Sequence, residues 1–471
     1  MSRLTLTRRE MLRLVGVGSA GALLSACVAN ATPQVVKETV EVEKVVQQTV
    51  EVEKVVQQTV QVEKLVTQAP APEGPVTIEF WQPFGDLNAR VIDGLVKQWN
   101  EANPNTQVKT TFTPNVTDAG TNPKFLAAAL SGNPPDVFIH DGSSFSTAMN
   151  LNAFTALDDL IKASNVKADD FFPWSWEKGT WKAHQYGVPL DTDARALFVN
   201  KDLLSKAGIQ EAPKTIEELE EAADKLTVEE GDRITRMGFI PWIGNSFLIF
   251  WGWDWGLKVW DAAANKIHLN ADEMVQALTW EIGYAEKYGV SAIQSFQQGF
   301  GSGANDPFRS GQVAMEVNGN WELNGLKEYA PNLQYDVSPI PYPAGRSPMT
   351  FAGGFVMGVP RGSKHVQQAW DFVYWFTAGD AAGQYAIQTE HLPTNIAAAK
   401  QMGDTSPTQK IFLDLLPVAY IEPVIPEWTL AWDAHVAAEQ EALFGQKSPK
   451  DALDAANEKV QAAIDTRLAA G

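Results

Sequence analysis

The order of apolar and polar side chains along most of the chain predicts alternating strands and helices. Residues 76–81 alternate in polarity and are rich in β-branched and aromatic side chains, which is typical of a strand. Residues 87–102 place apolar side chains three and four positions apart, as one face of a helix requires. A strand over 107–112, a helix over 124–131 and a buried strand over 136–139 follow. This βαβαβ order predicts an α/β fold with a parallel sheet covered by helices.

Polar and aromatic side chains stand where the predicted strands end. Ligands of open α/β sheets bind outside the carboxyl ends of the strands, at points where the strand order reverses. Further strands are predicted over 186–189 and 196–200, and Thr215 with Glu218 predicts the capping box of a helix up to residue 227. The candidate ligand contacts at strand ends are Trp81, Gln82, His140, Asp141, Asp191 and Asp193.

The first 26 residues have the order of a bacterial export signal. Arginines at positions 3, 8, 9 and 13 precede an apolar run over 14–24, and Leu-Ser-Ala-Cys ends at Cys27. The run is shorter than the roughly 20 residues that span a bilayer. The arginine pair resembles a twin-arginine signal and the tetrapeptide resembles a lipobox, which implies cleavage before Cys27 and lipid attachment to its sulfur. Cys27 is the one cysteine of the sequence, which excludes a disulfide framework.

A period of ten residues marks the segment after Cys27, predicted as a lipidated tether over residues 27–75. TVEVEKVVQQ occurs twice from Thr39, and TVQVEKLVTQ follows up to Gln68. Ten is a poor match to the seven-residue period of a coiled coil, and three copies would make a marginal β-solenoid. We therefore expect an extended spacer that closes with the Pro-rich linker 69–75 and holds the folded part away from the membrane.

The balance of charges limits the partners. The 471 residues include 57 acidic and 37 basic side chains, a formal net charge of −20. Such a surface repels nucleic acid and anionic lipid, so no nucleic-acid partner is expected. The six histidines are scattered without the spacing of metal motifs, so neither a metal site nor a cofactor is predicted. The chain without its signal is too long for one ordinary core, which favours two lobes.

Five of the sixteen tryptophans fall in the short segment from Trp242 to Trp260. Apolar faces of sugar rings stack on aromatic rings, while sugar hydroxyl groups bind carboxylates and amides. The segment therefore indicates a carbohydrate site, with Trp251 among the candidate contacts. The alternative is a role in the core, because Trp251 and Trp255 lie four positions apart on one helix face.

Six segments, in order along the chain, carry a resemblance to a known family. They are IEFWQPFGD; FLAAALSGNPPDVFIHD; YGVPLDTDARALFVNKDLLSKAGI with APKTIEELEEAADKL; DPFRSGQVAMEVNGNWEL; FAGGFVMGVPRGSKHVQQAWDFVYWFT; and HLPTN. Together they resemble extracellular solute-binding proteins of the sugar-binding type, the class that includes maltodextrin-binding proteins. The resemblance implies the periplasmic-binding-protein fold, with two α/β lobes joined by crossing segments and a ligand cleft between the lobes.

The resemblance also implies where the lobes divide. The implied crossings lie near 191–195, 352–355 and 392–394. Lobe 1 would hold residues 76–192 and 310–353, and lobe 2 residues 193–309 and 354–471, with 354–392 as a segment that can return to lobe 1. Gly353 and Gly354 suit a hinge that also approaches the ligand; an ordinary turn before a strand is the alternative.

Further ligand contacts follow from the resemblance. The NGNW motif supplies Trp321, with Asn318 or Asn320 nearby, and a late aromatic residue of the second lobe would be Trp428, beside Glu427. Trp242 lies where the second lobe of the family usually contributes a side chain. His140 departs from the aromatic residue often found at its position in the family, and could equally be a hydrogen-bonded core histidine. No catalytic residue is expected.

The function implied is that of the extracytoplasmic binding protein of an ABC importer. We expect a monomer, anchored to the cytoplasmic membrane through the lipid on Cys27. It would bind a carbohydrate, in the first place an oligosaccharide, by closure of the two lobes and deliver it to the transmembrane permease subunits.

Two other functions stay open. An exported glycoside hydrolase would also combine tryptophans with paired carboxylates, although no second acid can be placed opposite Asp191 and Asp193. A binding protein for a different solute, such as a glycerol phosphate, would need a cation in the cleft, and Arg195 is the one candidate at a crossing.

Overall fold

The structure is a computed structural model that describes residues 75–115, 122–231 and 233–470. The chain divides into two compact units, residues 1–73 and 74–471, and the described residues belong to the second. The predicted signal peptide, the lipidation site Cys27 and the tether repeats lie outside the described residues. Among the residues described, no helix is both long enough and apolar enough to cross a membrane.

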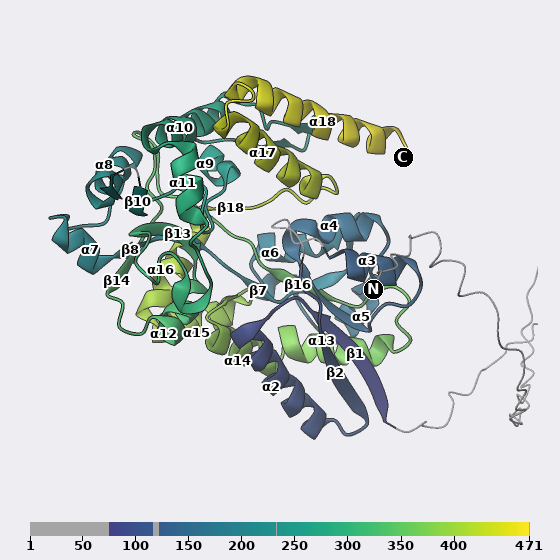
Figure 1. The fold of residues 1–471 in the computed structure, drawn as a ribbon. Helices are drawn as coiled ribbons and strands as arrows, with labels where there is room; N and C mark the ends of the chain where they lie inside the picture. Colours follow the sequence, from purple (N-terminus) through teal and green to yellow (C-terminus); the bar gives the residue numbers. More distant parts are fainter. Residues whose placement is uncertain (1–74, 116–121, 232, 471) are drawn as a thin grey trace, which may run out of the picture. The chain divides into compact units, whose positions relative to one another are not determined.

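The first lobe is built on a five-stranded sheet with helices on both faces (Figure 1). The strand order is β2 (Thr106–Phe112), β1 (Val76–Gln82), β3 (Val137–Asp141), β16 (Phe355–Gly358) and β6 (Gly187–Pro189). β1 is parallel to both of its neighbours, whereas β16 is antiparallel to both of its own. The sheet is therefore mixed rather than parallel throughout, because β16 enters it from the second lobe and runs against β3.

Alternating side chains of the sheet supply two separate cores in the first lobe. Val137 and Ile139 of β3 pack with one set of helices, and Phe138 between them packs on the opposite face. The helices of the first core are α2 (Asp86–Ala102), α13 (Val366–Thr377) and α14 (Asp380–Thr389). Those of the second are α3 (Pro123–Leu130) and α4 (Gly142–Asn150).

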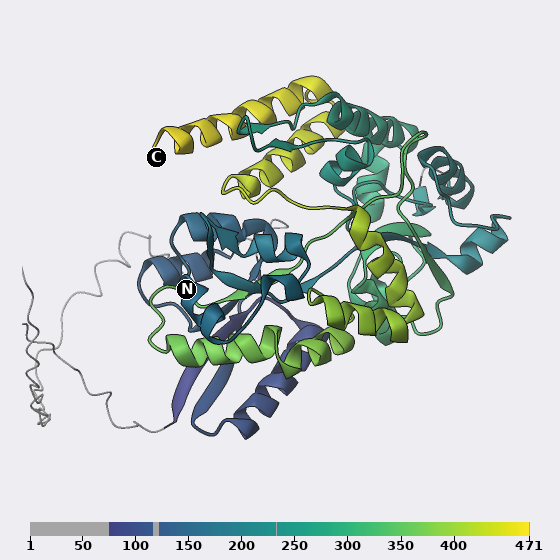
Figure 2. The ribbon, with the colours of Figure 1, turned by 180° about the vertical axis from the view of Figure 1, so that it is seen from behind.

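The second lobe is built on a three-stranded antiparallel sheet (Figure 2). Its order is β13 (Met315–Gly319), β8 (Arg195–Asn200) and β14 (Tyr335–Ser338). Leu197 and Val199 of β8 face the larger core, while Ala196 and Phe198 face a smaller one. The larger core includes α8 (Ile216–Leu226), α9 (Leu248–Asp254), α10 (Asp272–Tyr288), α17 (Trp428–Leu443) and α18 (Pro449–Ala469). The smaller core includes α12 (Glu322–Tyr329) and α16 (Pro407–Leu415).

Three segments connect the two lobes, and we call them the crossing segments: residues 190–194, 352–354 and 390–395. β7 (Asp191–Thr192) in the first pairs with β17 (Leu392–Pro393) in the third. The predicted assignment of residues 310–353 to lobe 1 is wrong, because β13 pairs with β8 of the second lobe. Residues 355–389 lie with the first lobe through β16, α13 and α14, the alternative that the prediction left open. Pairing between distant strands decides both points, and it cannot be read from a local pattern.

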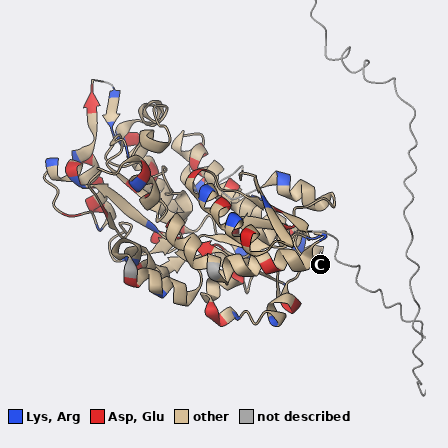
Figure 3. Cartoon of the chain, turned by 90° about the horizontal axis from the view of Figure 1, so that it is seen from below, with Lys and Arg blue, Asp and Glu red and all other residues tan. Residues whose placement is uncertain are grey.

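The remaining elements are short. In the first lobe they are α5 (Asp158–Ala163), η1 (Ala168–Asp170), α6 (Pro173–Lys178), β4 (Thr180–Trp181) and β5 (His184–Gln185). In the second they are α7 (Lys201–Lys206), β9 (Val228–Glu230), β10 (Arg233–Arg236), β11 (Trp260–Asp261), β12 (Lys266–Ile267), α11 (Val290–Gln297), η2 (Gly303–Asn305), β15 (Thr350–Phe351), α15 (Ile396–Thr405), η3 (Leu416–Val418) and β18 (Ala419–Tyr420). Acidic and basic side chains are interspersed over the described elements of both lobes (Figure 3).

Candidate functional site

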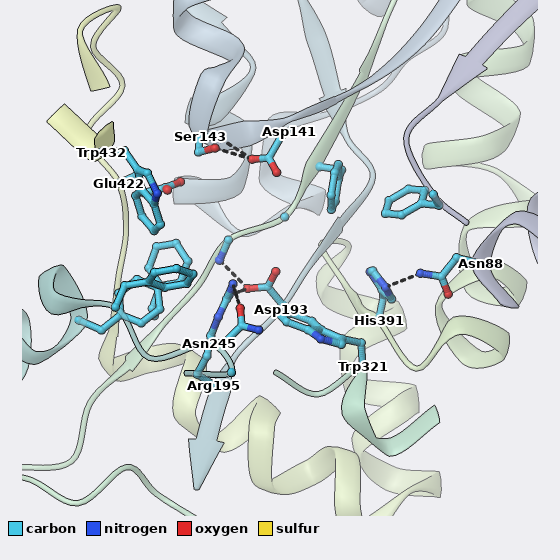
Figure 4. A pocket seen from close by; sticks show the side chains of 18 residues that line it. Asn88, Asp141, Ser143, Asp193, Arg195, Asn245, Trp321, His391, Glu422 and Trp432 are labelled. Carbon is cyan, nitrogen blue, oxygen red and sulfur yellow. Dashed lines mark hydrogen bonds and ion pairs between the residues drawn. The ribbon is translucent and has the colours of Figure 1, made fainter. Parts of the chain in front are cut away.

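A cavity of about 370 Å³ lies where the two lobes and the crossing segments meet (Figure 4). Its volume falls in the range of small-molecule sites. The first lobe contributes Phe84, Asn88, Asp141, Ser143 and Phe355. The crossing segments contribute Asp193, Gly353, Gly354 and His391, and the second lobe contributes Arg195, Gly244, Asn245, Phe247, Phe250, Trp321, Phe351, Glu422 and Trp432.

Asp141 brings a carboxylate to the first-lobe wall at the point where β3 ends and α4 begins. Its side chain caps α4, accepting from the backbone N–H of Ser143 at 2.9 Å and from the hydroxyl of Ser143 at 2.6 Å. Burial raises the pKa of Asp141, and the two hydrogen bonds from Ser143 oppose that rise. Phe84 and Phe355 stand nearby with ring centroids 4.5 Å apart in an edge-to-face arrangement. This part of the wall therefore offers a carboxylate beside aromatic surface.

An ion pair between Asp193 and Arg195 forms the base of the second-lobe wall. Asp193 also accepts the backbone N–H of Gly353 at 2.6 Å, which ties the first crossing segment to the second. The guanidinium of Arg195 lies 4.4 Å from the ring centroid of Phe351 and 4.8 Å from that of Trp321. Burial lowers the pKa of Arg195, while Asp193 raises it. Asp193 is thus paired with the only arginine among the described residues that line the cavity.

Trp321 presents its indole ring to the cavity from the turn between β13 and α12. The ring lies over Gly319, where a Cβ atom would come within 2.2 Å of it. The NGNW motif therefore needs a glycine two residues before the tryptophan. Arg195 reaches Asn245 at 3.5 Å, and Asn245 donates to Asn318 at 3.2 Å, so the polar floor beside the indole ring is fixed by hydrogen bonds.

Glu422 and Trp432 complete the second-lobe wall. The pairing of β18 with β15 sets the chain just before Glu422, and its carboxylate lies 3.7 Å from the ammonium group of Lys178 in the first lobe. Burial raises the pKa of Glu422 to about 7, against the effect of Lys178. Trp432 packs on Phe247 with ring centroids 4.9 Å apart. Lys178 also donates to the carbonyl oxygen of the second crossing segment at residue 352, at 3.2 Å.

The second crossing segment approaches the first so closely that one of its residues must be glycine. Gly354 has φ of 118°, and a Cβ atom there would lie 2.3 Å from the backbone oxygen of Asp191. Side chains avoid that conformation, so Gly354 is required by both its φ and its neighbours. At Gly353 a Cβ atom would lie 3.0 Å from the carboxylate oxygens of Asp193.

The cavity combines aromatic faces with hydrogen-bonding groups of both kinds. Three carboxylates line it, those of Asp141, Asp193 and Glu422, against the single guanidinium of Arg195. Such a lining suits a neutral ligand that has apolar faces and many hydroxyl groups, and it opposes an anion. Away from the cavity, the carboxylates of Asp306, Glu316 and Glu322 lie within 4.8 Å of one another, but Glu322 is already paired with Arg309.

Five of the fourteen residues proposed from the sequence line the cavity: Asp141, Asp193, Trp321, Gly353 and Gly354. The other nine do not: Trp81, Gln82, His140, Asp191, Trp242, Trp251, Asn318, Glu427 and Trp428.

Tryptophans of the second lobe serve its core. Trp251 is 1% exposed and donates to the carbonyl oxygen of Pro241 at 2.9 Å, and Trp428 is fully buried and stacks on Trp253. Trp242 is half-buried and packs edge-to-face on Tyr284. Trp251 lies on α9, so the core role considered as the alternative for this segment holds for it, whereas Trp242 lies in the turn before that helix.

Three proposed contacts of the first lobe also have other roles. His140 is buried among phenylalanine rings, and its pKa is lowered to about 4 by burial. The side-chain oxygen of Gln82 accepts the backbone N–H of Phe84 at 2.6 Å, which shapes the turn after β1. Trp81 packs on the second core of this lobe and lies under the ammonium group of Lys124, 4.6 Å from its centroid.

Of the remaining three proposed contacts, two bond to residues that line the cavity, and the third pairs with a residue of a neighbouring helix. Asp191 bonds to His391, and Asn318 accepts from Asn245. Glu427 pairs with Arg467 of the last helix at 2.6 Å.

Several lining residues went unnoticed in the sequence: Asn88, Ser143, Asn245, His391, Glu422 and Trp432, with the phenylalanines. His391 was within reach, because it opens the HLPTN segment at the third crossing. Trp432 follows Trp428 by one helical turn. The sequence therefore predicted an aromatic contact from this helix, but the prediction chose Trp428 in place of Trp432. Glu422 stands in an irregular stretch, where no local pattern marks it.

Comparisons with known proteins agree with this architecture. The family model described as bacterial extracellular solute-binding protein matches residues 86–382. The maltodextrin-binding protein of Bacillus subtilis is 29% identical over 356 residues, covering 69% of this chain and 77% of that protein. The sn-glycerol-3-phosphate-binding periplasmic protein of Escherichia coli is 23% identical over 414 residues, covering 81% of this chain and 91% of that protein.

Solved structures show the same two-lobed fold. The structure of CpMnBP1 with mannobiose bound matches with a TM-score of 0.75 and 32% identity, covering 82% of this chain and 99% of that one. The family model spans well over half of the chain. The chain belongs to the family of bacterial extracellular solute-binding proteins.

Proposed function

We propose that this chain binds a neutral carbohydrate in the cavity between its lobes. The observation that carries the proposal is the lining itself: the indole of Trp321 and several phenylalanine rings stand beside Asp141, Asp193 and Asn245. Aromatic faces cover the C–H surfaces of a sugar ring, and carboxylates and amides accept and donate to its hydroxyl groups. The cavity volume of about 370 Å³ suits one or two sugar rings better than a long chain.

Two relatives support a carbohydrate ligand by what they bind. One is named for maltodextrin, and the other was solved with mannobiose bound. We therefore take a disaccharide of hexoses as the first ligand to test.

The charge of the lining argues against a phosphate ester, although one relative is named for glycerol 3-phosphate. Arg195 is the cation of the lining, and its guanidinium is already paired with Asp193. An anion would also meet the carboxylates of Asp141 and Glu422, and neither a lysine nor a second arginine is among the described residues that line the cavity. A sugar without charge avoids both costs.

We propose further that the protein acts outside the cytoplasm as a lipid-anchored partner of an ABC permease. The family is extracellular by description, and two sequence resemblances support the proposal: the first 26 residues resemble an export signal, and the tetrapeptide that ends at Cys27 resembles a lipobox. The lobes would close on the sugar, and the closed form would be the one that the permease subunits accept. The protein would bind its ligand without cleaving it.

A thermal-shift screen of the purified mature chain tests the proposal. The panel holds mannobiose, maltose, maltotriose, glucose and glycerol 3-phosphate, each at millimolar concentration. A sugar with micromolar affinity raises the free energy of unfolding by about 3–4 kcal/mol at a thousandfold excess, which moves the melting temperature by several degrees. A shift with glycerol 3-phosphate alone contradicts the proposal, and release of free monosaccharide from an oligosaccharide contradicts binding without cleavage.

A further inference from the structure

The carboxylate of Asp191 lies at the junction of all three crossing segments, yet it does not line the cavity. Its Oδ1 accepts the backbone N–H of Phe355, at the end of the second crossing segment, at 2.9 Å. Its Oδ2 accepts from the hydroxyl of Tyr385 at 3.0 Å and lies 2.7 Å from Nδ1 of His391 in the third segment. The side chain of Asp191 is 1% exposed, so these partners take the place of water.

These contacts determine which ring nitrogen of His391 carries a proton. Burial raises the pKa of Tyr385, so its hydroxyl keeps its hydrogen and donates to Asp191. Asp191 accepts at both oxygens, and Nδ1 of His391 must therefore donate to it. In the neutral ring Nε2 then has a lone pair. The side-chain nitrogen of Asn88, on α2 of the first lobe, lies 3.1 Å from Nε2.

His391 and Asn88 both line the cavity, and Figure 4 shows the hydrogen bond between them. If Nε2 accepts, the amide of Asn88 must point its NH₂ at His391, and its carbonyl oxygen is left for a ligand. If Nε2 carries a proton, the amide must turn over, and the cavity then meets a donor in place of an acceptor. The state of the imidazole therefore sets the hydrogen-bonding character of Asn88.

We propose that Asp191 is a positioning residue for ligand binding, which holds His391 in the Nδ1–H form so that the carbonyl oxygen of Asn88 is presented to a sugar hydroxyl. The inference rests on the proposed function only for the identity of the ligand. An aspartate that fixes the tautomer of a histidine through Nδ1 is the arrangement by which outer residues orient histidines in many sites. The contact between Asp191 and His391 also joins the first crossing segment to the third.

The groups around His391 give the inference a dependence on pH. Phe84 from the first lobe, Trp321 from the second and Tyr385 from α14 have ring centroids 5.8–6.5 Å from that of the imidazole. Burial lowers the pKa of His391, but Asp191 and, less strongly, Asp193 raise it, and the net direction is upward. We therefore expect the affinity for a sugar to fall as the pH decreases through this raised pKa, because Asn88 must then turn over.

The test measures two quantities in wild type, in Asp191→Asn and in a control, Tyr385→Phe. The control removes a hydrogen bond from the same oxygen of Asp191 and leaves its charge and its contact with His391. The pKa of His391 is read without ligand by NMR of ¹³C-labelled histidine, assigned with His391→Gln. The affinity for mannobiose is read by calorimetry between about pH 5.5 and 8.

Asp191→Asn should bring the pKa of His391 below its usual range, because burial then acts without the carboxylate. It should also weaken mannobiose binding about tenfold at pH 8, the effect of losing the hydrogen bond between the carbonyl oxygen of Asn88 and a sugar hydroxyl. Tyr385→Phe should keep the raised pKa. The proposal is overturned if Asp191→Asn leaves either the pKa of His391 or the affinity unchanged, or if Tyr385→Phe alters both equally.

Two outcomes separate this inference from the proposed function. Wild type that binds no sugar refutes the carbohydrate assignment, while the ligand-free titration of His391 still tests the role of Asp191. If Asp191→Asn does not fold, His391→Gln carries the test: it removes the titrating ring, so the part of the pH dependence of binding that follows the pKa of His391 should disappear. Glu422, whose pKa is raised to about 7, lines the same cavity and keeps its own contribution. A pH dependence of binding in His391→Gln identical to that of wild type overturns the proposal.

Discussion

Replacing Trp321 by alanine should weaken sugar binding without unfolding the protein. The indole ring lines the cavity from a half-buried position and lies over Gly319 and beside Arg195. A sugar ring stacked on it would remove about 60 Å² of apolar surface from water, which at about 25 cal/mol per Å² is about 1.5 kcal/mol. Arg195, which is itself buried, also loses a cation–π neighbour, but it loses that contact in the free protein and in the complex alike, so the affinity does not change through it. We expect about 1.5 kcal/mol, or a dissociation constant raised about tenfold.

Isothermal titration calorimetry with mannobiose is the suitable assay, because the substitution removes a fluorophore that a fluorescence titration would need. Trp242→Ala is the matched control: the same residue type in the same lobe, half-buried, but packed on Tyr284 away from the cavity. Its affinity should stay within twofold of wild type. Equal losses in the two variants, or none in Trp321→Ala, would refute the reasoning that places the sugar on this ring.

Three further changes separate stability from binding. Trp251→Ala should lower the free energy of unfolding in urea by about 3–5 kcal/mol, because Trp251 is 1% exposed in the core; a loss below 1 kcal/mol would contradict that placement. Gly354→Ala should cost about 2 kcal/mol or more, because φ at this position is 118° and the Cβ atom would meet Asp191; Gly94→Ala, where a Cβ atom meets nothing within 4 Å, is its control and should not destabilise. Burial raises the pKa of Asp254 to about 8 from an ordinary value of 3.8, so the native state holds this proton longer than the unfolded chain does. Stability from this group is complete below the ordinary pKa and is lost as the pH rises towards 8. Between pH 5 and 7 this group should therefore cost the wild type roughly 3 kcal/mol of unfolding free energy, and Asp254→Asn should not show that loss in urea unfolding. A dependence of stability on pH that is the same in both proteins would contradict the reasoning.

Local patterns predicted the elements and some of the site. Thr215 accepts the backbone N–H of Glu218 at 3.2 Å, which is the first bond of the predicted capping box. The carboxylate of Glu218 accepts the backbone N–H of Lys214 at 2.7 Å, one residue before the N-cap position that the capping box implies. Asp141 and Asp193 lie at the cavity because strand ends gather at one edge of a sheet, a rule that needs only the strand positions.

What the sequence could not settle depends on how elements pack. Trp428 and Trp432 lie one turn apart on α17, and only the docking of that helix turns the first into the core and the second towards the cavity. Glu422 reaches the site because β18 pairs with β15, about seventy residues earlier in the chain. The same limit explains the misplaced lobe boundary, since β13 could join either sheet until its pairing with β8 is known.

A crystal structure of the mature chain with mannobiose tests the central claim most directly. We expect one sugar ring on the indole of Trp321, with hydroxyl groups bonded to Asp193 and, across the cavity, to Asp141 and Asn88. Sugar bound outside this cavity, without contact to Trp321, would contradict the account.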